Sequence, residues 1–205
     1  MASMLVVFGD RTAFEVHEAA CLGYADQFER IERIYFEEES FKLRYLPEFT
    51  ETGAKVYFNV GVSDQRVKSQ IAKRCLEEGW SPFSVVHPVA VVSPSAILGE
   101  GVFVGPLAVI SSNAKIGDHS IVHIHASVGH DVVMGQYSSI LPGARVSGSV
   151  ELGDRVLIGS NAFVAAGINI GDDSQVDALT YVRRDVSTNQ IVSLRAAGPM
   201  PRVNF

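Results

Sequence analysis

The second half of the chain carries an apolar residue at every sixth position. Stepping by six from Val86 reaches an aliphatic side chain or methionine at each position as far as Val182. Glycine often follows this residue, and a small or β-branched residue usually stands four places after it. An α-helix repeats every 3.6 residues and a strand every two, so neither explains a period of six. The pattern predicts a left-handed parallel β-helix, in which three hexads form one coil and residues 18 apart lie about 4.8 Å from one another.

This period predicts which side chains face outward. The large residue of each hexad fills the interior, the small residue two places before the next large one also points inward, and the two residues after the glycine position form a corner. His130 and Asp131 therefore lie at an outward corner, where a core histidine has no reason to be. Eighteen residues away lie Ser112 on one side and Gly148 on the other. A titratable ring beside a backbone-exposing residue suits a general base next to an oxyanion-binding amide.

The first 84 residues follow a different pattern. Short apolar runs predict strands over residues 4–9, 31–38 and 54–62, and helical spacing predicts helices over 12–24 and 64–79, the second capped by Asp64. This order is typical of a small parallel α/β domain. We therefore expect an α/β domain over residues 1–84, the β-helix over 85–190 and a C-terminal tail over 191–205.

Composition excludes several other classes of protein. The net charge of −6 and the absence of a basic stripe argue against a nucleic-acid binder. No apolar run approaches the roughly 18 residues of a membrane span, and the start lacks the basic region of a signal peptide. We expect a cytoplasmic protein without membrane insertion. Cys21 and Cys75 are too few for a disulfide framework, and we interpret both as small buried residues.

Two segments carry a resemblance to a known family. They are residues 58–88 and the stretch "ASVGHDVVMGQYSSILPGARVSG" over 126–148. The whole chain resembles the sialic-acid O-acetyltransferase and bacterial nucleotide-sugar N-acetyltransferase family. The resemblance implies a small Rossmann-like N-terminal domain joined to a left-handed β-helix, assembly as a homotrimer, and acetyl-CoA bound between adjacent subunits. It implies acetyl transfer to an amine or hydroxyl of a sugar-like acceptor, and N- and O-acetylation stay open.

The same resemblance implies roles for particular residues. His130 would be the general base, Asp131 its neighbouring acid, and the amide of Gly148 a donor to the thioester oxygen. Further positions follow from the family pattern. On the cofactor side these are Ser139, Ala166, Arg183 and Arg184, and on the acceptor side Gly9, Asp10 and Arg11. No metal is implied.

The chain departs from the family pattern at two places. Asp10, Arg11 and Thr12 replace the flexible glycines of a phosphate-binding turn, so we expect nucleotides to bind weakly there. Ser139 stands where some relatives carry a second histidine.

Other interpretations stay open beside the transferase. His125 and His130 have the spacing of two zinc ligands in β-helical carbonic anhydrases of the γ class, but the third ligand would fall at Val89, which cannot bind zinc. His119 and His123 belong to the same metal hypothesis. A non-enzymatic scaffold that kept the repeat is a further alternative. Glu37, Glu38 and Glu39 could hold a ribose or lie in a solvated loop. Arg183 and Arg184 could bind the cofactor or cap the last coil. Asp118, Asp154 and Asp172 also lie at corners, and we interpret them as turn residues.

Overall fold

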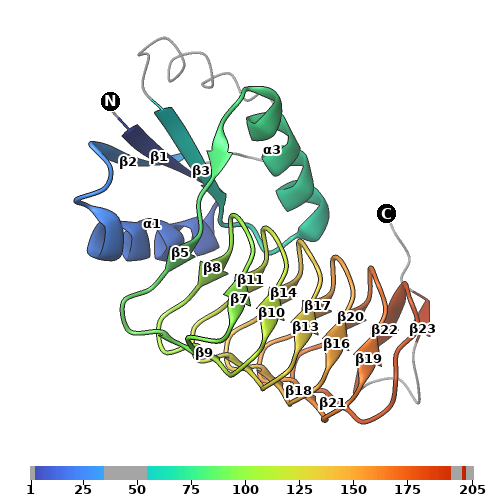
Figure 1. Cartoon of the computed structure of the whole chain (residues 1–205). Coiled ribbons are helices and arrows are strands. Elements are labelled where there is room, and N and C mark those ends of the chain that lie inside the picture. The colour runs from blue at the N-terminus through green and yellow to red at the C-terminus, as the bar shows by residue number, and fades with distance from the viewer. Residues whose placement is uncertain (1–2, 35–54, 195–199, 202–205) are drawn as a thin grey trace.

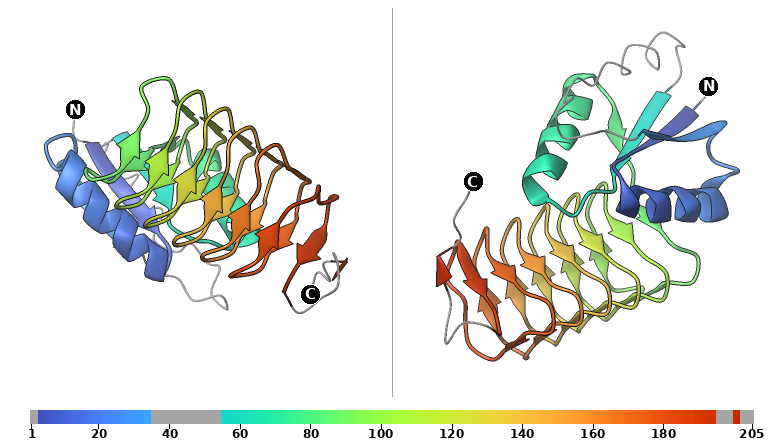
Figure 2. Two further views of the ribbon diagram at one scale, coloured as in Figure 1. Left: turned by 90° about the horizontal axis from the view of Figure 1, so that it is seen from below. Right: turned by 180° about the vertical axis from the view of Figure 1, so that it is seen from behind.

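The computed structural model describes residues 3–34, 55–194 and 200–201. A small α/β domain lies against one end of a long stack of coils, and residues 200–201 lie at the other end (Figure 1). The views in Figure 2 show the N-terminal strands and helices gathered over the first coils, with the later coils extending past them.

The N-terminal domain is built around a parallel sheet in the order β2-β1-β3-β4. Its elements are β1 (Ser3–Phe8), α1 (Arg11–Tyr24), β2 (Arg30–Ile34), β3 (Lys55–Val60), α3 (Gln65–Glu77) and β4 (Ser81–Pro82). Alternate residues of β1 point to opposite faces, and both faces are buried. Helix α1 packs on one face and α3 on the other, so a parallel sheet with helices on both sides results.

The strand and helix positions agree closely with the sequence pattern. Asp64 caps α3, because its carboxylate accepts hydrogen bonds from the backbone amides of Arg66 and Val67, each at 2.9 Å. Strand β2 begins at Arg30, and residues 35–38 of the predicted second strand lie outside the described residues, as do Glu37, Glu38 and Glu39. The prediction of two buried cysteines is half wrong: Cys75 is buried, but Cys21 is exposed. Cys21 lies off the stripe of buried residues with which α1 meets the sheet.

Residues 85–192 form a parallel β-helix whose strands have two residues each, except the three-residue β22, and lie in three sheets. The six-stranded sheet holds β6 (Val91–Val92), β9 (Val109–Ile110), β12 (Ser127–Val128), β15 (Arg145–Val146), β18 (Phe163–Val164) and β21 (Tyr181–Val182). The five-stranded sheet holds β7 (Ile97–Leu98), β10 (Lys115–Ile116), β13 (Val133–Met134), β16 (Glu151–Leu152) and β19 (Asn169–Ile170). The eight-stranded sheet holds β5 (Val85–Val86), β8 (Phe103–Val104), β11 (Ile121–Val122), β14 (Ser139–Ile140), β17 (Leu157–Ile158), β20 (Gln175–Val176), β22 (Gln190–Val192) and β23 (Met200–Pro201).

The strand register confirms the six-residue period and the 18-residue coil predicted from the sequence. From β5 to β21 each strand pairs with the strand 18 residues away, as Val128 does with Val146. The apolar residue of each hexad is buried from Val104 through Val182. From Gly101 through Leu179 the second residue of each corner takes a left-handed backbone, and Asp131 does so with φ of 57°. Parallel strands in stacked sheets fit the predicted left-handed β-helix acyltransferase fold. At the far end, β22 pairs parallel with β20, and β23 then pairs antiparallel with β22.

The N-terminal domain covers the outer face of the first strands of the eight-stranded sheet, from β5 to β14. Phe103 and Ile121 point out of this sheet and join the cluster between β1 and α1. Lys68 of α3 is fully buried here, and its ammonium donates to Ser139 Oγ at 2.9 Å and to the carbonyls of Tyr137 and Ser138 at 3.3 and 3.4 Å. Burial lowers the pKa of Lys68 to about 7.

Two histidines of the β-helix complete this interface. The His119 ring stacks on Phe58 of β3 and on Tyr137 of the next coil, with ring centroids 5.7 and 5.2 Å apart. His123 Nε2 lies 3.4 Å from both Thr12 Oγ1 and Ser63 Oγ. Burial lowers the pKa of each histidine to about 4, so both are neutral at pH 7.

These buried bases make the fold sensitive to acid. The unfolded chain binds protons at both histidines below about pH 6.5, whereas the folded chain does so only near pH 4. The free energy of unfolding should therefore fall as the pH drops from 6.5 to 4, by about 3 kcal/mol for each histidine. His119→Phe keeps the aromatic stack and removes one titration. Thermal unfolding between pH 4 and 8 should show a shallower pH dependence for this variant, and an unchanged slope would contradict the prediction.

Among the described residues, no helix has the length and apolar character needed to cross a membrane.

Candidate active site

His130 and Asp131 lie where the chain turns from the six-stranded to the five-stranded sheet, between β12 and β13. We call the turns between these two sheets the His130 corner. Three sheets enclose the coil, so this corner lies opposite the eight-stranded sheet that the N-terminal domain covers. The His130 corner therefore faces away from the chain's own N-terminal domain.

His130 and Asp131 form a close pair. His130 Nδ1 lies 2.8 Å from Asp131 Oδ2. The hydrogen bond from His130, followed by a second from Asn113, holds the pKa of the Asp131 carboxyl below its usual range. The ionised carboxylate accepts the Nδ1 proton and leaves the lone pair of Nε2 free. This is the tautomer that a general base needs.

Gly148 lies directly against the His130 ring. A Cβ built on Gly148 would stand 2.5 Å from both Cε1 and Nε2 of His130, a distance that real side chains do not reach. Only glycine lets the imidazole lie over the backbone of the next coil in this way. The basic nitrogen thus lies against the backbone of Gly148, as the 18-residue spacing predicts.

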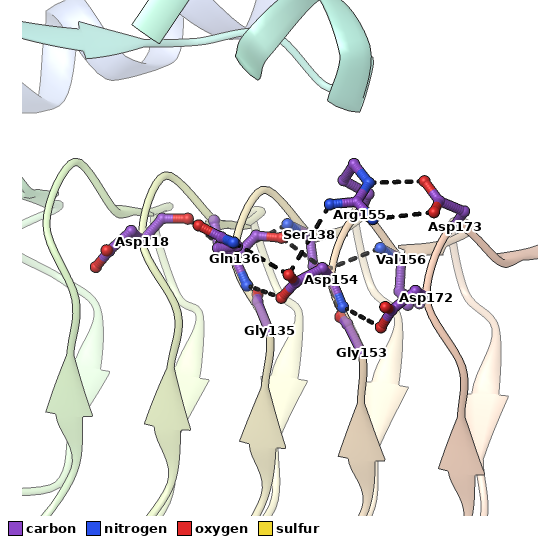
Figure 3. A network of polar contacts seen from close by, with 11 residues as sticks. Asp118, Gly135, Gln136, Ser138, Gly153, Asp154, Arg155, Val156, Asp172 and Asp173 are labelled. Atoms are coloured by element: carbon purple, nitrogen blue, oxygen red, sulfur yellow. Dashed lines mark hydrogen bonds and ion pairs between the residues drawn. The ribbon is translucent and has the colours of Figure 1, made fainter. Parts of the chain in front are cut away.

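The Gly148 amide is free to bind a ligand. It donates no hydrogen bond to any residue that the structure describes. A different set of turns shows how such an amide can be capped. These are the turns from the five-stranded to the eight-stranded sheet, which we call the aspartate corner (Figure 3). There the equivalent amides of Glu100, Gln136 and Asp154 are capped. Each donates at 2.9–3.0 Å to the carboxylate 18 residues later, which belongs to Asp118, Asp154 or Asp172.

Ala166 occupies the corresponding position above Gly148. It follows Gly148 by 18 residues, as Asp154 follows Gln136, but alanine has no oxygen with which to cap the amide. Arg184 lies one further coil along the same column, and Arg183 precedes it. The predicted cofactor-side residues Gly148, Ala166 and Arg184 therefore share one corner with His130. Both arginines are exposed.

Ser139 lies elsewhere. It belongs to β14 in the eight-stranded sheet, is fully buried, and bonds to Lys68. A side chain covered in this way has no surface left for a cofactor, so we assign Ser139 to the interface between the domains.

The predicted acceptor-side residues follow the carboxyl end of β1. Gly9 has φ of 133°, and a Cβ there would stand 2.5 Å from the carbonyl oxygen of Gly61, so a side chain would not fit. Asp10 and Arg11 are exposed at the start of α1, and the Asp10 side chain makes no cap hydrogen bond. They lie on the same side of the molecule as His123, which Thr12 contacts.

The metal hypothesis has no support in the site geometry. Within the described ranges, no three His, Cys, Asp or Glu residues lie together as a metal would require. His119 and His123 are buried at the domain interface instead, and His125 is exposed at another corner.

Gly148→Ala tests the contact between ring and backbone. The new Cβ should push the imidazole off the corner, so we expect kcat to fall about 10- to 100-fold while the coil stays folded, as happens when reacting groups move by about 1 Å. Acetyl transfer by Gly148→Ala, His130→Ala and the double variant would measure it. If the glycine acts through the ring, the double variant should be no slower than His130→Ala alone.

Known proteins share this architecture. A model of the hexapeptide repeat of succinyl-transferase matches residues 149–184. No curated protein sequence matches the chain.

Solved structures extend the likeness to both domains. A mutant of perosamine N-acetyltransferase from Caulobacter crescentus, in complex with CoA and GDP-perosamine, is 26% identical; the match covers 98% of this chain and 97% of that one, with a TM-score of 0.83. The acetyltransferase domain of PglB from Neisseria gonorrhoeae, in complex with acetyl coenzyme A, is 26% identical, with coverage of 98% and 100% and a TM-score of 0.82. WeeI from Acinetobacter baumannii shares the fold at 20% identity, with coverage of 97% and 100% and a TM-score of 0.86.

Proposed function

We propose, from the premise that this chain belongs to the hexapeptide-repeat family of sialic-acid O-acetyltransferases and bacterial nucleotide-sugar N-acetyltransferases, that His130 is the general base of its reaction. The chain is an acyltransferase that uses acetyl-CoA and acts on a sugar or sugar-like acceptor. The observation that carries the proposal is the His130 ring lying over Gly148, with its Nδ1 held by Asp131.

The reaction follows from these three residues. Nε2 of His130 takes the proton from the acceptor amine or hydroxyl as that atom bonds to the acetyl carbon. The free amide of Gly148 donates to the carbonyl oxygen, where negative charge develops. The carbon–sulfur bond then breaks, and CoA leaves as the thiolate, which His130 can protonate. Asp131 keeps the tautomer and stabilises the imidazolium between the two proton transfers.

We further propose that the protein works as a homotrimer with its site between subunits. The N-terminal domain and His130 lie on opposite sides of the prism within one chain. An acceptor held by an N-terminal domain can therefore reach His130 only if that domain belongs to a neighbour. Exposed apolar residues on the six-stranded sheet support such packing: Val91, Val109, Phe163 and Tyr181.

The Rossmann-like N-terminal domain is proposed as the acceptor-binding part. Gly9, Asp10 and Arg11 stand at the carboxyl end of β1, the place where open α/β sheets bind ligands. The similar C. crescentus enzyme was solved with a nucleotide-linked amino sugar. In this chain Asp10 would repel a diphosphate, so we expect the acceptor to bind weakly through its nucleotide. We place the protein in the cytoplasm, with acetyl-CoA and its acceptor.

The test is acetyl transfer from acetyl-CoA to a panel of nucleotide-linked amino sugars, free amino sugars and hydroxyl analogues, followed by release of the CoA thiol. Turnover with any member of the panel supports the proposal if it falls about 10²- to 10⁴-fold in His130→Ala. Light scattering checks the assembly, and a clean monomer with full activity would overturn the intersubunit site. Thermal stabilisation by acetyl-CoA without turnover on any acceptor would favour the scaffold alternative.

A further inference from the structure

Asn113 reaches the catalytic pair from one coil below. It lies at the His130 corner, 18 residues before Asp131, and its side-chain Nδ2 donates to Asp131 Oδ1 at 3.0 Å. His130 uses the other carboxylate oxygen, Oδ2, at 2.8 Å. The Asp131 carboxylate thus has one partner on each oxygen, and the two partners come from adjacent coils.

The backbone of Asn113 is itself held in place. Its φ is 59°, a left-handed conformation that asparagine tolerates better than other side-chain-bearing residues. Its amide donates to Ser95 Oγ at 3.1 Å, one coil further down. The side-chain amide that meets Asp131 therefore stands on an anchored turn.

Asp131 differs in this respect from the aspartates of the aspartate corner. Asp118, Asp154 and Asp172 each accept a backbone amide, which fixes the carboxylate within the turn. Asp131 accepts only from the side chains of Asn113 and His130 among the hydrogen bonds of the described residues. Its side chain is 53% exposed, and the terminal torsion of aspartate is broad. Without Asn113, only the histidine that it must orient would hold this carboxylate.

We propose that Asn113 is a positioning residue for proton transfer: its side-chain amide fixes the Asp131 carboxylate so that Oδ2 receives the Nδ1 proton of His130 and Nε2 remains the base. This inference rests on the proposed function, because it concerns the same histidine. It makes the base a three-residue unit, Asn113–Asp131–His130, that spans two coils.

Two substitutions separate this role from a role in the turn. Asn113→Gly keeps the positive φ without strain and removes the amide, and Asn113→Asp keeps the shape but turns the donor into a second carboxylate. Asn161→Gly is the matched control, because Asn161 occupies the same position of its own corner with φ of 55°. We expect kcat to fall about 3- to 10-fold in Asn113→Gly. This expected fall in kcat is no larger than that caused by removing a residue that orients a buried metal ligand, because solvent screens interactions at an exposed site.

Asn113→Asp should be slower than Asn113→Gly, since two carboxylates in contact repel and raise the pKa of Asp131. The KM for acetyl-CoA should stay unchanged in both, and Asn161→Gly should keep wild-type kcat. A purely structural role predicts instead that Asn113→Gly and Asn161→Gly behave alike. Equal and undiminished kcat in these two variants would overturn the proposal.

Nitrogen-15 NMR of the His130 ring gives a readout that does not depend on turnover. In the wild-type protein with a neutral ring, we expect the tautomer protonated at Nδ1, and in Asn113→Gly a mixture of both tautomers. If no acceptor is acetylated but the tautomer changes as described, the proposed function fails and the role of Asn113 stands. If transfer occurs and His130 keeps one tautomer in Asn113→Gly, the role of Asn113 is wrong and the proposed function stands.

Discussion

Replacing His130 with alanine is expected to lower kcat by about 10²–10⁴, the usual contribution of a positioned general base. The ring lies outside the core at a corner and is 65% exposed, so its removal creates no cavity. The fold and the melting temperature should stay close to wild type. In the proposed reaction this side chain takes a proton and does not hold the cofactor, so the KM for acetyl-CoA should change little.

His125→Ala is the appropriate control for this experiment. His125 is also exposed at a corner, with φ of 56°, but it lies between other sheets. His119 and His123 are unsuitable, because both are buried beneath the N-terminal domain. A folded His130→Ala protein that acetylates its acceptor at the wild-type rate would remove His130 as the base.

Replacing Ala166 with asparagine is expected to lower kcat by about 10²–10³, the cost of losing one oxyanion donor. The side-chain oxygen would stand where Asp154 stands at the aspartate corner, and it should cap the Gly148 amide as Asp154 caps that of Gln136. Asparagine is preferred to aspartate because it adds no charge near the cofactor phosphates. The cap should leave the melting temperature unchanged or raise it slightly.

Asp154→Ala is the opposite control, because it removes a cap from a backbone amide instead of adding one. It frees the amide of Gln136 at a corner remote from His130 and should cost stability without affecting kcat. Kinetics and thermal unfolding of both variants would settle the point. An active Ala166→Asn enzyme, in which a crystal structure shows the Gly148 amide capped, would exclude that amide as the oxyanion donor.

The hexad period predicted the β-helix and the contact between His130 and Gly148, because both depend on repeat geometry alone. The same step of 18 applied to Asp131 leads to Asn113, so the signal for the positioning residue was present in the sequence. The free amide of Gly148 was also readable, from alanine at 166 where the aspartate corner carries a carboxylate. What marks Asp131 as different from a turn aspartate is its partners, and these appear only in the structure.

The docking of the domains could not be read from the sequence. Lys68 looks like a solvated position of an amphipathic helix, but it is buried because the β-helix supplies three acceptors from residues 69 to 71 places later. Ser139 was expected near the cofactor and lies beneath this lysine instead. Periodicity describes each coil and helix by itself, whereas such contacts depend on how two units meet.

The 18-residue column also restricts how this chain can change in length. Asn113, Asp131 and Gly148 lie on one corner only because whole coils separate them. An insertion of one hexad between Asn113 and His130 would keep every apolar residue in the interior and yet carry Asn113 to a different corner. Deleting a hexad between His130 and Gly148 would likewise leave a foldable prism without the proposed oxyanion donor beside the histidine. Insertions that preserve activity should therefore be found at the ends of the stack, or in loops that do not change which corner each later residue occupies.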